Sequence, residues 1–236
     1  MITLLDCIER IPQCMREIRS SYPKRERELS AYFSSRGIGR VKRLVFIASG
    51  SSYNSAHGAK LFIEKQCGVS VGLQYPNMFV NYEGEFELAE EDTVYVVISQ
   101  GGETRLVYEA LKKLKMAGAA CIAVTAQEDT PIAREAECFQ FMGCGREEFM
   151  YRTIGFSTSV AVCCFVGLAA GVYNKTVTEQ EKEDYLKDFD SMIQNLSAVE
   201  KLSLIHIYTG HAIKSRNLKW IGHAGTEEPI RIFNSL

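Results

Sequence analysis

The sequence predicts an α/β fold in which helices cover both faces of a parallel β-sheet. Two observations lead to this prediction. Apolar runs rich in valine and isoleucine, such as residues 44–47 and 94–97, alternate with segments of helical periodicity, which is typical of parallel sheets buried between helices. The chain also has 236 residues, of which 46% are hydrophobic, and this is enough for one such domain with extra helices.

The first 36 residues are expected to be mostly helical. Thr3 is placed to cap a first helix, and Pro23 is placed to open a second one. Pro12 lies inside the apolar pattern of the first helix, so a kink or a break is expected there. We therefore expect an N-terminal helical arm over residues 1–40.

The central domain is expected to span residues 41–175. Its strands are predicted at residues 43–48, 70–74, 93–99, 120–125 and 138–142. Its helices are predicted at residues 54–66, 77–84, 103–117 and 131–137. In sheets of this kind, ligands bind beyond the carboxyl ends of the strands, near the point where the strand order reverses.

The segment Ile154–Tyr173 is uncharged and approaches the length of about 20 residues that a membrane span needs. Serine, threonine and glycine residues dilute it, and neither an aromatic belt nor a basic cluster frames it. A buried core or interface helix is therefore favoured over a transmembrane helix, and no association with a membrane is expected.

The last part of the chain, residues 176–236, is expected to form C-terminal helices followed by an incomplete repeat. A long helical pattern covers residues 178–207, with Thr178 and Glu181 as a capping box at its start. Residues 217–226 resemble the first strand and its loop, so they are interpreted as the stub of a possible second unit.

Composition excludes several classes of function. The formal net charge is -2, which provides no electrostatic footprint for a nucleic acid. The 8 cysteines contain no C-x-x-C pair, so reduced thiols of a cytoplasmic protein are favoured over a disulfide scaffold or a zinc site. The histidines show no spacing of metal ligands, and no metal is expected.

Two turns rich in hydroxyl groups and glycine carry the functional prediction. Residues 48–54 and 98–104 each follow an apolar run and precede a helix. Such a turn directs backbone N–H groups and hydroxyls at one spot, with the positive end of the helix dipole behind it. The pair therefore predicts a phosphate site. The alternative is a pair of ordinary turns with helix-capping hydroxyls. Ser51 and Ser52 would then cap a helix that starts at Tyr53, a role that is compatible with binding a phosphate.

The turns read Ser-Gly-Ser-Ser-Tyr-Asn-Ser at positions 49–55 and Ser-Gln-Gly-Gly-Glu-Thr at positions 99–104. They resemble the two phosphate-binding loops of the SIS (sugar isomerase) domain family, and the similarity extends over about residues 44–173. Within the family, the isomerase half of glucosamine-6-phosphate synthase and the fructosamine-6-phosphate deglycases are the most similar branches. The resemblance implies a three-layer αβα sandwich with a flavodoxin-like, five-stranded parallel sheet that binds a phosphosugar.

The resemblance also implies which residues bind the phosphosugar. They are Gly50, Ser51, Ser52, Ser99, Gln100, Gly101 and Thr104. Two positions depart from the family pattern. Gly101 stands where the family commonly has a serine, and Ser159 stands where the synthase branch has a lysine, so one hydroxyl donor and one positive charge are absent.

Glu147 and Glu148 are the candidate catalytic residues, because an isomerase needs a carboxylate to move a proton between C1 and C2 of an open-chain sugar. The alternative is that both belong to a solvated charged loop. The family takes its catalytic glutamate and histidine from a second SIS unit or a neighbouring chain, so the resemblance transfers no catalytic glutamate to this sequence.

The sequence therefore predicts an aldose–ketose isomerase or a deglycase that acts on an amino- or amine-linked sugar 6-phosphate through an enediol. The open alternatives are a non-catalytic phosphosugar-binding or regulatory module and a truncated form of a protein with two SIS units. The family places its active sites where SIS units meet, so a homodimer is expected. No organic cofactor is implied.

Overall fold

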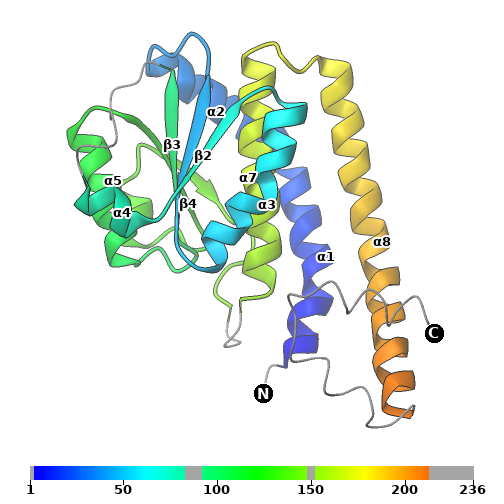
Figure 1. The fold of residues 1–236 in the computed structure, drawn as a ribbon. Helices are drawn as coiled ribbons and strands as arrows, with labels where there is room; N and C mark the ends of the chain where they lie inside the picture. The colour runs from blue at the N-terminus through cyan, green and yellow to red at the C-terminus, as the bar shows by residue number, and fades with distance from the viewer. Residues whose placement is uncertain (1–2, 83–91, 148–151, 213–236) are drawn as a thin grey trace. The chain divides into compact units, whose positions relative to one another are not determined.

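The computed structural model describes residues 3–82, 92–147 and 152–212, with side chains up to residue 196. A five-stranded parallel sheet lies at its centre, in the order β2-β1-β3-β4-β5 (Figure 1). Its strands are β1 (Arg43–Ile47), β2 (Ser70–Gln74), β3 (Thr93–Ile98), β4 (Ala120–Thr125) and β5 (Cys138–Phe141). The predicted sheet is confirmed.

Helices cover both faces of this sheet, as Figure 1 shows. The helices are α1 (Leu4–Ser20), α2 (Tyr22–Ser35), α3 (Ser51–Gln66), α4 (Pro76–Asn81), α5 (Arg105–Met116), α6 (Pro131–Glu135), α7 (Ile154–Tyr173) and α8 (Glu179–Ala212). α4, α5 and α6 cover one face, while α3 and α7 cover the other, with α1 and α2 packed against α7. The predicted three-layer αβα sandwich with additional helices is confirmed.

Burial on both faces explains the composition of the strands. Every residue of β3 and β4 is buried. Side chains alternate between the two faces of a strand, so Val45, Ile47 and Val97 join one apolar cluster with the inner faces of α5 and α6. Strands buried on both sides have no polar face, which is why their sequences are apolar runs.

The strand order reverses between β1 and β3. The chain leaves β1 through α3 to reach β2 on one side, and it leaves β3 through α5 to reach β4 on the other side. Crossovers of one hand in opposite directions place α3 and α5 on opposite faces of the sheet. Both helices nevertheless begin at the same edge, directly beyond the carboxyl ends of two neighbouring strands.

The apolar helix α7 is long and apolar enough to cross a membrane, but 78% of its most hydrophobic window is buried inside the described structure. It packs against α1, α2 and α3. The approach to α3 is close, because a Cβ atom at Gly167 would lie 2.4 Å from Ile63 Cγ1. The prediction of a buried helix is confirmed.

The first helix differs from the prediction at Pro12. Thr3 caps α1 as expected, within a capping box that includes Asp6. α1 then runs through Pro12 to Ser20 as one helix, so of the predicted kink or break the break is wrong. Proline removes one helical hydrogen bond. The buried side chains of α1, which include Met15 and Ile18, pack on α7 and hold the helix together despite that loss.

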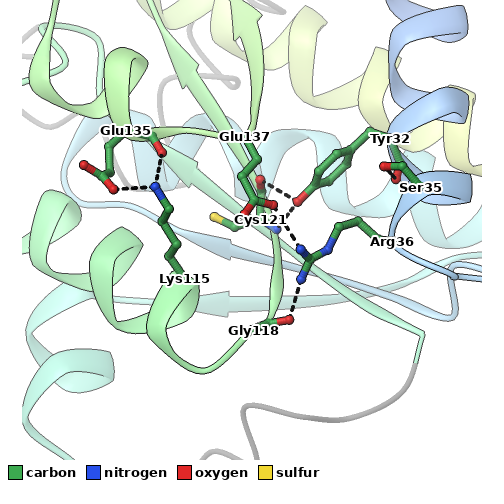
Figure 2. A network of polar contacts seen from close by, with 8 residues as sticks. All are labelled: Tyr32, Ser35, Arg36, Lys115, Gly118, Cys121, Glu135 and Glu137. Carbon is green, nitrogen blue, oxygen red and sulfur yellow. Dashed lines mark hydrogen bonds and ion pairs between the residues drawn. The ribbon is translucent and has the colours of Figure 1, made fainter.

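A polar network joins α2 to the end of the sheet where the strands begin, which is opposite the end where α3 and α5 start (Figure 2). The Tyr32 hydroxyl donates to the backbone oxygen of Cys121 and accepts from its N–H. Arg36 donates to the Gly118 carbonyl oxygen and pairs with Glu137. These contacts satisfy backbone groups at the start of β4, so the network is structural and lies away from the carboxyl edge.

The chain divides into two compact units, residues 1–194 and residues 195–236. The expected N-terminal arm and central domain both fall in the first unit. The beginning of α8 also belongs to it, and Arg19 forms a salt bridge there with Asp190. The predicted stub at residues 217–226 lies outside the described residues.

Candidate functional site

The two hydroxyl- and glycine-rich loops lie side by side at the carboxyl edge of the sheet. Ile47 and Val97 are paired in neighbouring parallel strands, which are about 4.8 Å apart in such sheets. The first loop starts one residue after Ile47, and the second starts two residues after Val97. The structure therefore brings both loops to the point where the strand order reverses, where ligands of α/β sheets bind.

Gly50 shapes the first loop. It precedes α3 with φ of 58° and ψ of -132°, a backbone conformation that residues other than glycine rarely adopt. The first helical hydrogen bond runs from the Asn54 N–H to the Gly50 carbonyl oxygen at 3.1 Å. The N–H groups of Ser51, Ser52 and Tyr53 thus start the helix without an intrahelical acceptor.

No described side chain caps the start of α3. Ser51 and Ser52 lie inside the first turn rather than before it, so the alternative in which they cap the helix is wrong. Both side chains are half-buried, and a Cβ atom at Gly50 would meet no heavy atom within 4 Å. The start of α3 is therefore open, and its N–H groups and two hydroxyls are available to a ligand.

The second loop is a tight turn closed by a hydrogen bond from the Gly102 N–H to the Ser99 carbonyl oxygen at 3.0 Å. Thr104 precedes α5, but its side chain makes no capping hydrogen bond. Its hydroxyl instead lies 2.8 Å from Ser99 Oγ. One hydroxyl must donate to the other, so the pair keeps one O–H for a ligand. Ser99 is buried and Thr104 is exposed.

Gln100 is tied to Glu147 rather than left free in the loop. Its Nε2 atom donates to Glu147 Oε2 at 3.0 Å and lies 3.7 Å from Cys144 Sγ. A Cβ atom at Gly155 would lie 2.2 Å from the same nitrogen. The side chain of Gln100 is therefore packed between the loop after β5 and the start of α7.

Glu147 caps α7. Its Oε1 atom accepts from the N–H groups of Thr153 at 2.8 Å and Ile154 at 2.9 Å, and its Oε2 atom accepts from Gly155 at 3.1 Å. Burial raises the pKa of Glu147, but the hydrogen bonds from Gln100 and these three N–H groups outweigh burial and lower the pKa overall.

Glu147 is 6% exposed, so the alternative in which it belongs to a solvated loop is wrong. Glu148, the other candidate catalytic residue, lies outside the described residues. The sequence did not predict this cap, because Glu147 stands six to eight residues before the N–H groups that donate to it. Local capping patterns place the acceptor within three residues.

The remaining positions at this edge offer space and aromatic surface. A Cβ atom at Gly101 would meet no heavy atom within 4 Å. Ser159 is buried in α7, and its hydroxyl has no partner among the described residues. The ring of Tyr53, in the first turn of α3, stacks on Tyr75 with 4.2 Å between ring centroids. Arg152 is exposed and donates to the Glu147 carbonyl oxygen at 3.4 Å.

Neither a metal cluster nor a reactive thiol is found here. Among the described residues, no group of three histidine, cysteine, aspartate or glutamate side chains is arranged to hold a metal ion. Burial raises the pKa of Cys144 to about 11, so its thiol stays protonated at neutral pH. All eight cysteines are free.

Comparison with known families agrees with this geometry. The family model described as "SIS domain" matches residues 38–169, a range that contains both loops, the whole sheet and most of α7. This chain belongs to the SIS domain family. The match begins before β1 and ends inside α7, so α1, α2 and α8 of this SIS protein lie outside the matched range.

Two curated relatives are enzymes named glutamine–fructose-6-phosphate aminotransferase [isomerizing]. The one from Arabidopsis thaliana is 29% identical over 151 residues, which are 64% of this chain and 22% of the relative. The one from Lactococcus lactis is 25% identical over 222 residues, which are 93% of this chain and 36% of the relative. The SIS protein thus spans about a quarter to a third of the length of these relatives.

Solved structures share the fold. The C-terminal domain of glucosamine-fructose-6-phosphate aminotransferase from Francisella tularensis aligns with a TM-score of 0.70 at 20% identity, over 81% of this chain and 53% of that one. A structure from Clostridium difficile 630 aligns with a TM-score of 0.76 at 23% identity, over 88% of this chain and 57% of that one.

Proposed function

We propose that this SIS domain binds the phosphate group of a sugar 6-phosphate at the edge shared by β1 and β3. The observation that carries the proposal is the pair of helices, α3 and α5, that begin there without a side-chain cap among the described residues. Their first N–H groups have no intrahelical acceptor, and both helices start beyond the paired ends of β1 and β3.

A phosphate suits this arrangement better than a neutral ligand. Each helix N-terminus carries about half a positive charge, and the two helices begin at the same edge of the sheet from its opposite faces. Hydroxyl groups add donors that need no counter-charge. The residues proposed to bind the phosphosugar are Gly50, Ser51, Ser52, Ser99, Gln100, Gly101 and Thr104.

We further propose that the bound sugar is an amino- or amine-linked 6-phosphate and that the protein takes part in its aldose–ketose isomerisation or deglycation. The names of the curated relatives support the isomerase chemistry. The step requires a base that removes a proton from one sugar carbon and returns it to the neighbouring carbon through an enediol. Glu148 remains the proposed base, since the carboxylate of Glu147 already accepts four hydrogen bonds.

Calorimetric titration of the full chain with glucosamine 6-phosphate, fructose 6-phosphate and fructoselysine 6-phosphate tests the binding. The matching sugars without phosphate serve as controls. Binding that depends on the phosphate supports the proposal. Equal affinity for a sugar with and without its phosphate would contradict it.

A turnover assay with the same three compounds tests the chemistry. Turnover that is lost in Glu148→Gln, with phosphosugar binding retained, supports the proposed base. Binding without turnover of any compound would instead indicate a binding module.

A homodimer in the cytoplasm belongs to the same proposal. α7 is largely covered by α1, α2 and α3, so it has little surface left for a second chain. Analytical ultracentrifugation measures the oligomeric state, and a monomer at micromolar concentration would contradict the dimer.

A further inference from the structure

We propose that Glu147 is a positioning residue for the phosphate site: acting through Gln100, it holds the second loop against the start of α7 in the conformation that binds the anion. This inference rests on the proposed function and adds to it. Glu147 is removed from the candidate bases and receives a different role, one that the loops alone do not reveal.

The Glu147 carboxylate has no acceptor position left for a substrate proton. Three of its four hydrogen bonds come from the N–H groups that start α7, and the fourth comes from Gln100. Two oxygens with two hydrogen bonds each form a saturated acceptor, buried at 6% exposure. A carboxylate held in this way is a fixed anchor between two segments far apart in the sequence.

Gln100 is fixed through both its backbone and its side chain. Its backbone oxygen accepts from the Ala126 N–H at 3.0 Å, which ties the loop to the segment after β4. The side-chain amide of Gln100 reaches toward the start of α7, where it contacts Glu147 and Cys144. Gly155 leaves the room for that amide, because a Cβ atom there would overlap it at 2.2 Å. The pair therefore links the phosphate loop to α7.

The direction in which phosphate affinity changes when Glu147 loses its charge distinguishes a positioning residue from a carboxylate that only repels the ligand. A negative charge close to a phosphate dianion repels it, so removal of a carboxylate that does nothing else should tighten phosphate binding. A positioning role predicts the opposite. Loss of the charge removes the anchor of Gln100, the loop loses its fixed conformation, and binding weakens. The two roles are thus separated by direction and not only by size.

The test is a titration of the wild-type chain, Glu147→Gln and Gln100→Met with inorganic phosphate and with fructose 6-phosphate. Glutamine at 147 keeps the shape but brings an NH₂ group against N–H donors, so we expect Kd to rise about tenfold. Gln100→Met removes the link and leaves Glu147 on the three N–H groups of α7, which keeps the helix capped. Because Gln100 is itself among the residues proposed to bind the phosphosugar, the effect of Glu147→Gln in the two backgrounds, and not Gln100→Met alone, separates positioning from direct binding.

Two further variants make the result specific. Glu147→Gln in the Gln100→Met background should change Kd less than twofold, because Glu147 acts through Gln100. Glu181→Gln is the matched control: Glu181 accepts from the Thr178 N–H at 2.8 Å in the capping box of α8, away from the phosphate loops. It should leave Kd unchanged.

The outcomes separate this inference from the proposed function. If the wild-type chain binds neither phosphate compound, the proposed function fails. If the wild-type chain binds and Glu147→Gln binds equally well or more tightly, the positioning role fails while the proposed function stands. If Glu147→Gln does not fold, the effect of Gln100→Met on Kd decides, and an unchanged Kd overturns the inference.

Discussion

The start of α7 is capped by a carboxylate of this chain, whereas no described side chain caps the starts of α3 and α5. α7 begins on a carboxylate of its own chain, because Glu147 accepts its first N–H groups. α3 and α5 begin next to the reversal of strand order, and no described side chain caps either of them. The first N–H groups of α7 thus have a side-chain acceptor, whereas those of α3 and α5 have none among the described residues.

This difference teaches where to look for a ligand. Every helix start carries unsatisfied N–H groups and a partial positive charge. Capping boxes at α1 and α8 show that this chain can supply a cap locally, and Glu147 shows that it can supply one from a distance. The starts of α2 and α4 also lack a side-chain cap within the described part of the chain, but each has a proline in its first turn. The starts of α3 and α5 are distinguished by their position, because both lie directly beyond the paired strands β1 and β3.

Gly102→Ala should destabilise the protein at the loop that precedes α5, and this is the largest of the four expected effects. Gly102 has φ of 66°, and an added Cβ atom would lie 2.2 Å from Thr130 Oγ1. A left-handed conformation costs a residue with a side chain about 1–2 kcal/mol, and overpacking costs about 1–3 kcal/mol more. Urea unfolding should show this loss. Gly101→Ala is the matched control, since its Cβ atom meets open space, and equal destabilisation of both variants would contradict the prediction.

Acid should reduce the stability that the Glu147 cap of α7 contributes to the folded protein. Hydrogen bonds lower the pKa of Glu147 below the ordinary glutamate value of about 4.3. A group with a lowered pKa in the folded state stabilises the protein above its unfolded pKa, and that stability is lost as the pH falls through the folded pKa.

The free energy of unfolding of the wild-type chain should therefore exceed that of Glu147→Gln at neutral pH. The difference should shrink between about pH 5 and pH 3. Urea unfolding of both proteins across this range measures it. Glu181 also has a lowered pKa, caused by its hydrogen bonds to Thr178, but it is present in both proteins and cancels. A difference that does not depend on pH would contradict the prediction.

Thr104→Val should weaken phosphate binding at the open start of α5. Valine keeps the shape and removes the hydroxyl that pairs with Ser99 Oγ. Loss of one such donor costs about 1 kcal/mol, or about fivefold in Kd. Thr178→Val is the matched control, because Thr178 caps α8. Titration with fructose 6-phosphate should show weaker binding for the first variant alone.

Gly101→Ser should strengthen phosphate binding, with the smallest effect of the four. The position has open space around it, and a serine there restores the hydroxyl that the family commonly has. We expect Kd to fall about threefold. Gly101→Ala serves as the control without a hydroxyl. If serine and alanine bind phosphate equally, the added hydroxyl does not face the ligand.

Much of the fold was predictable because its signals are local. The strands were predicted to within one residue at each end, since residues such as those of β3 are apolar over their whole length. The start of α3 was placed three residues too late. Gly50, with its positive φ, is the N-cap residue of that helix. Ser51 and Ser52, which resemble caps in the sequence, lie inside the first turn.

The site divides in the same way. Both loops could be recognised from their residue types, because strand, turn and helix follow one another along the chain. The contact of Gln100 with Glu147 joins residues 47 positions apart, and no periodicity or spacing indicates it. A charge in a polar loop resembles a solvent-exposed charge until the tertiary structure buries it.

The order of strands and helices, the apolar character of the sheet and the two turns rich in glycine and hydroxyl groups were thus determined by the amino-acid sequence alone, because each depends on residues that are neighbours in the chain. Only the tertiary structure decided which helix starts remain open. That outcome depends on whether a distant acceptor such as Glu147 reaches the N–H groups of a helix, and the path of the whole chain sets that distance.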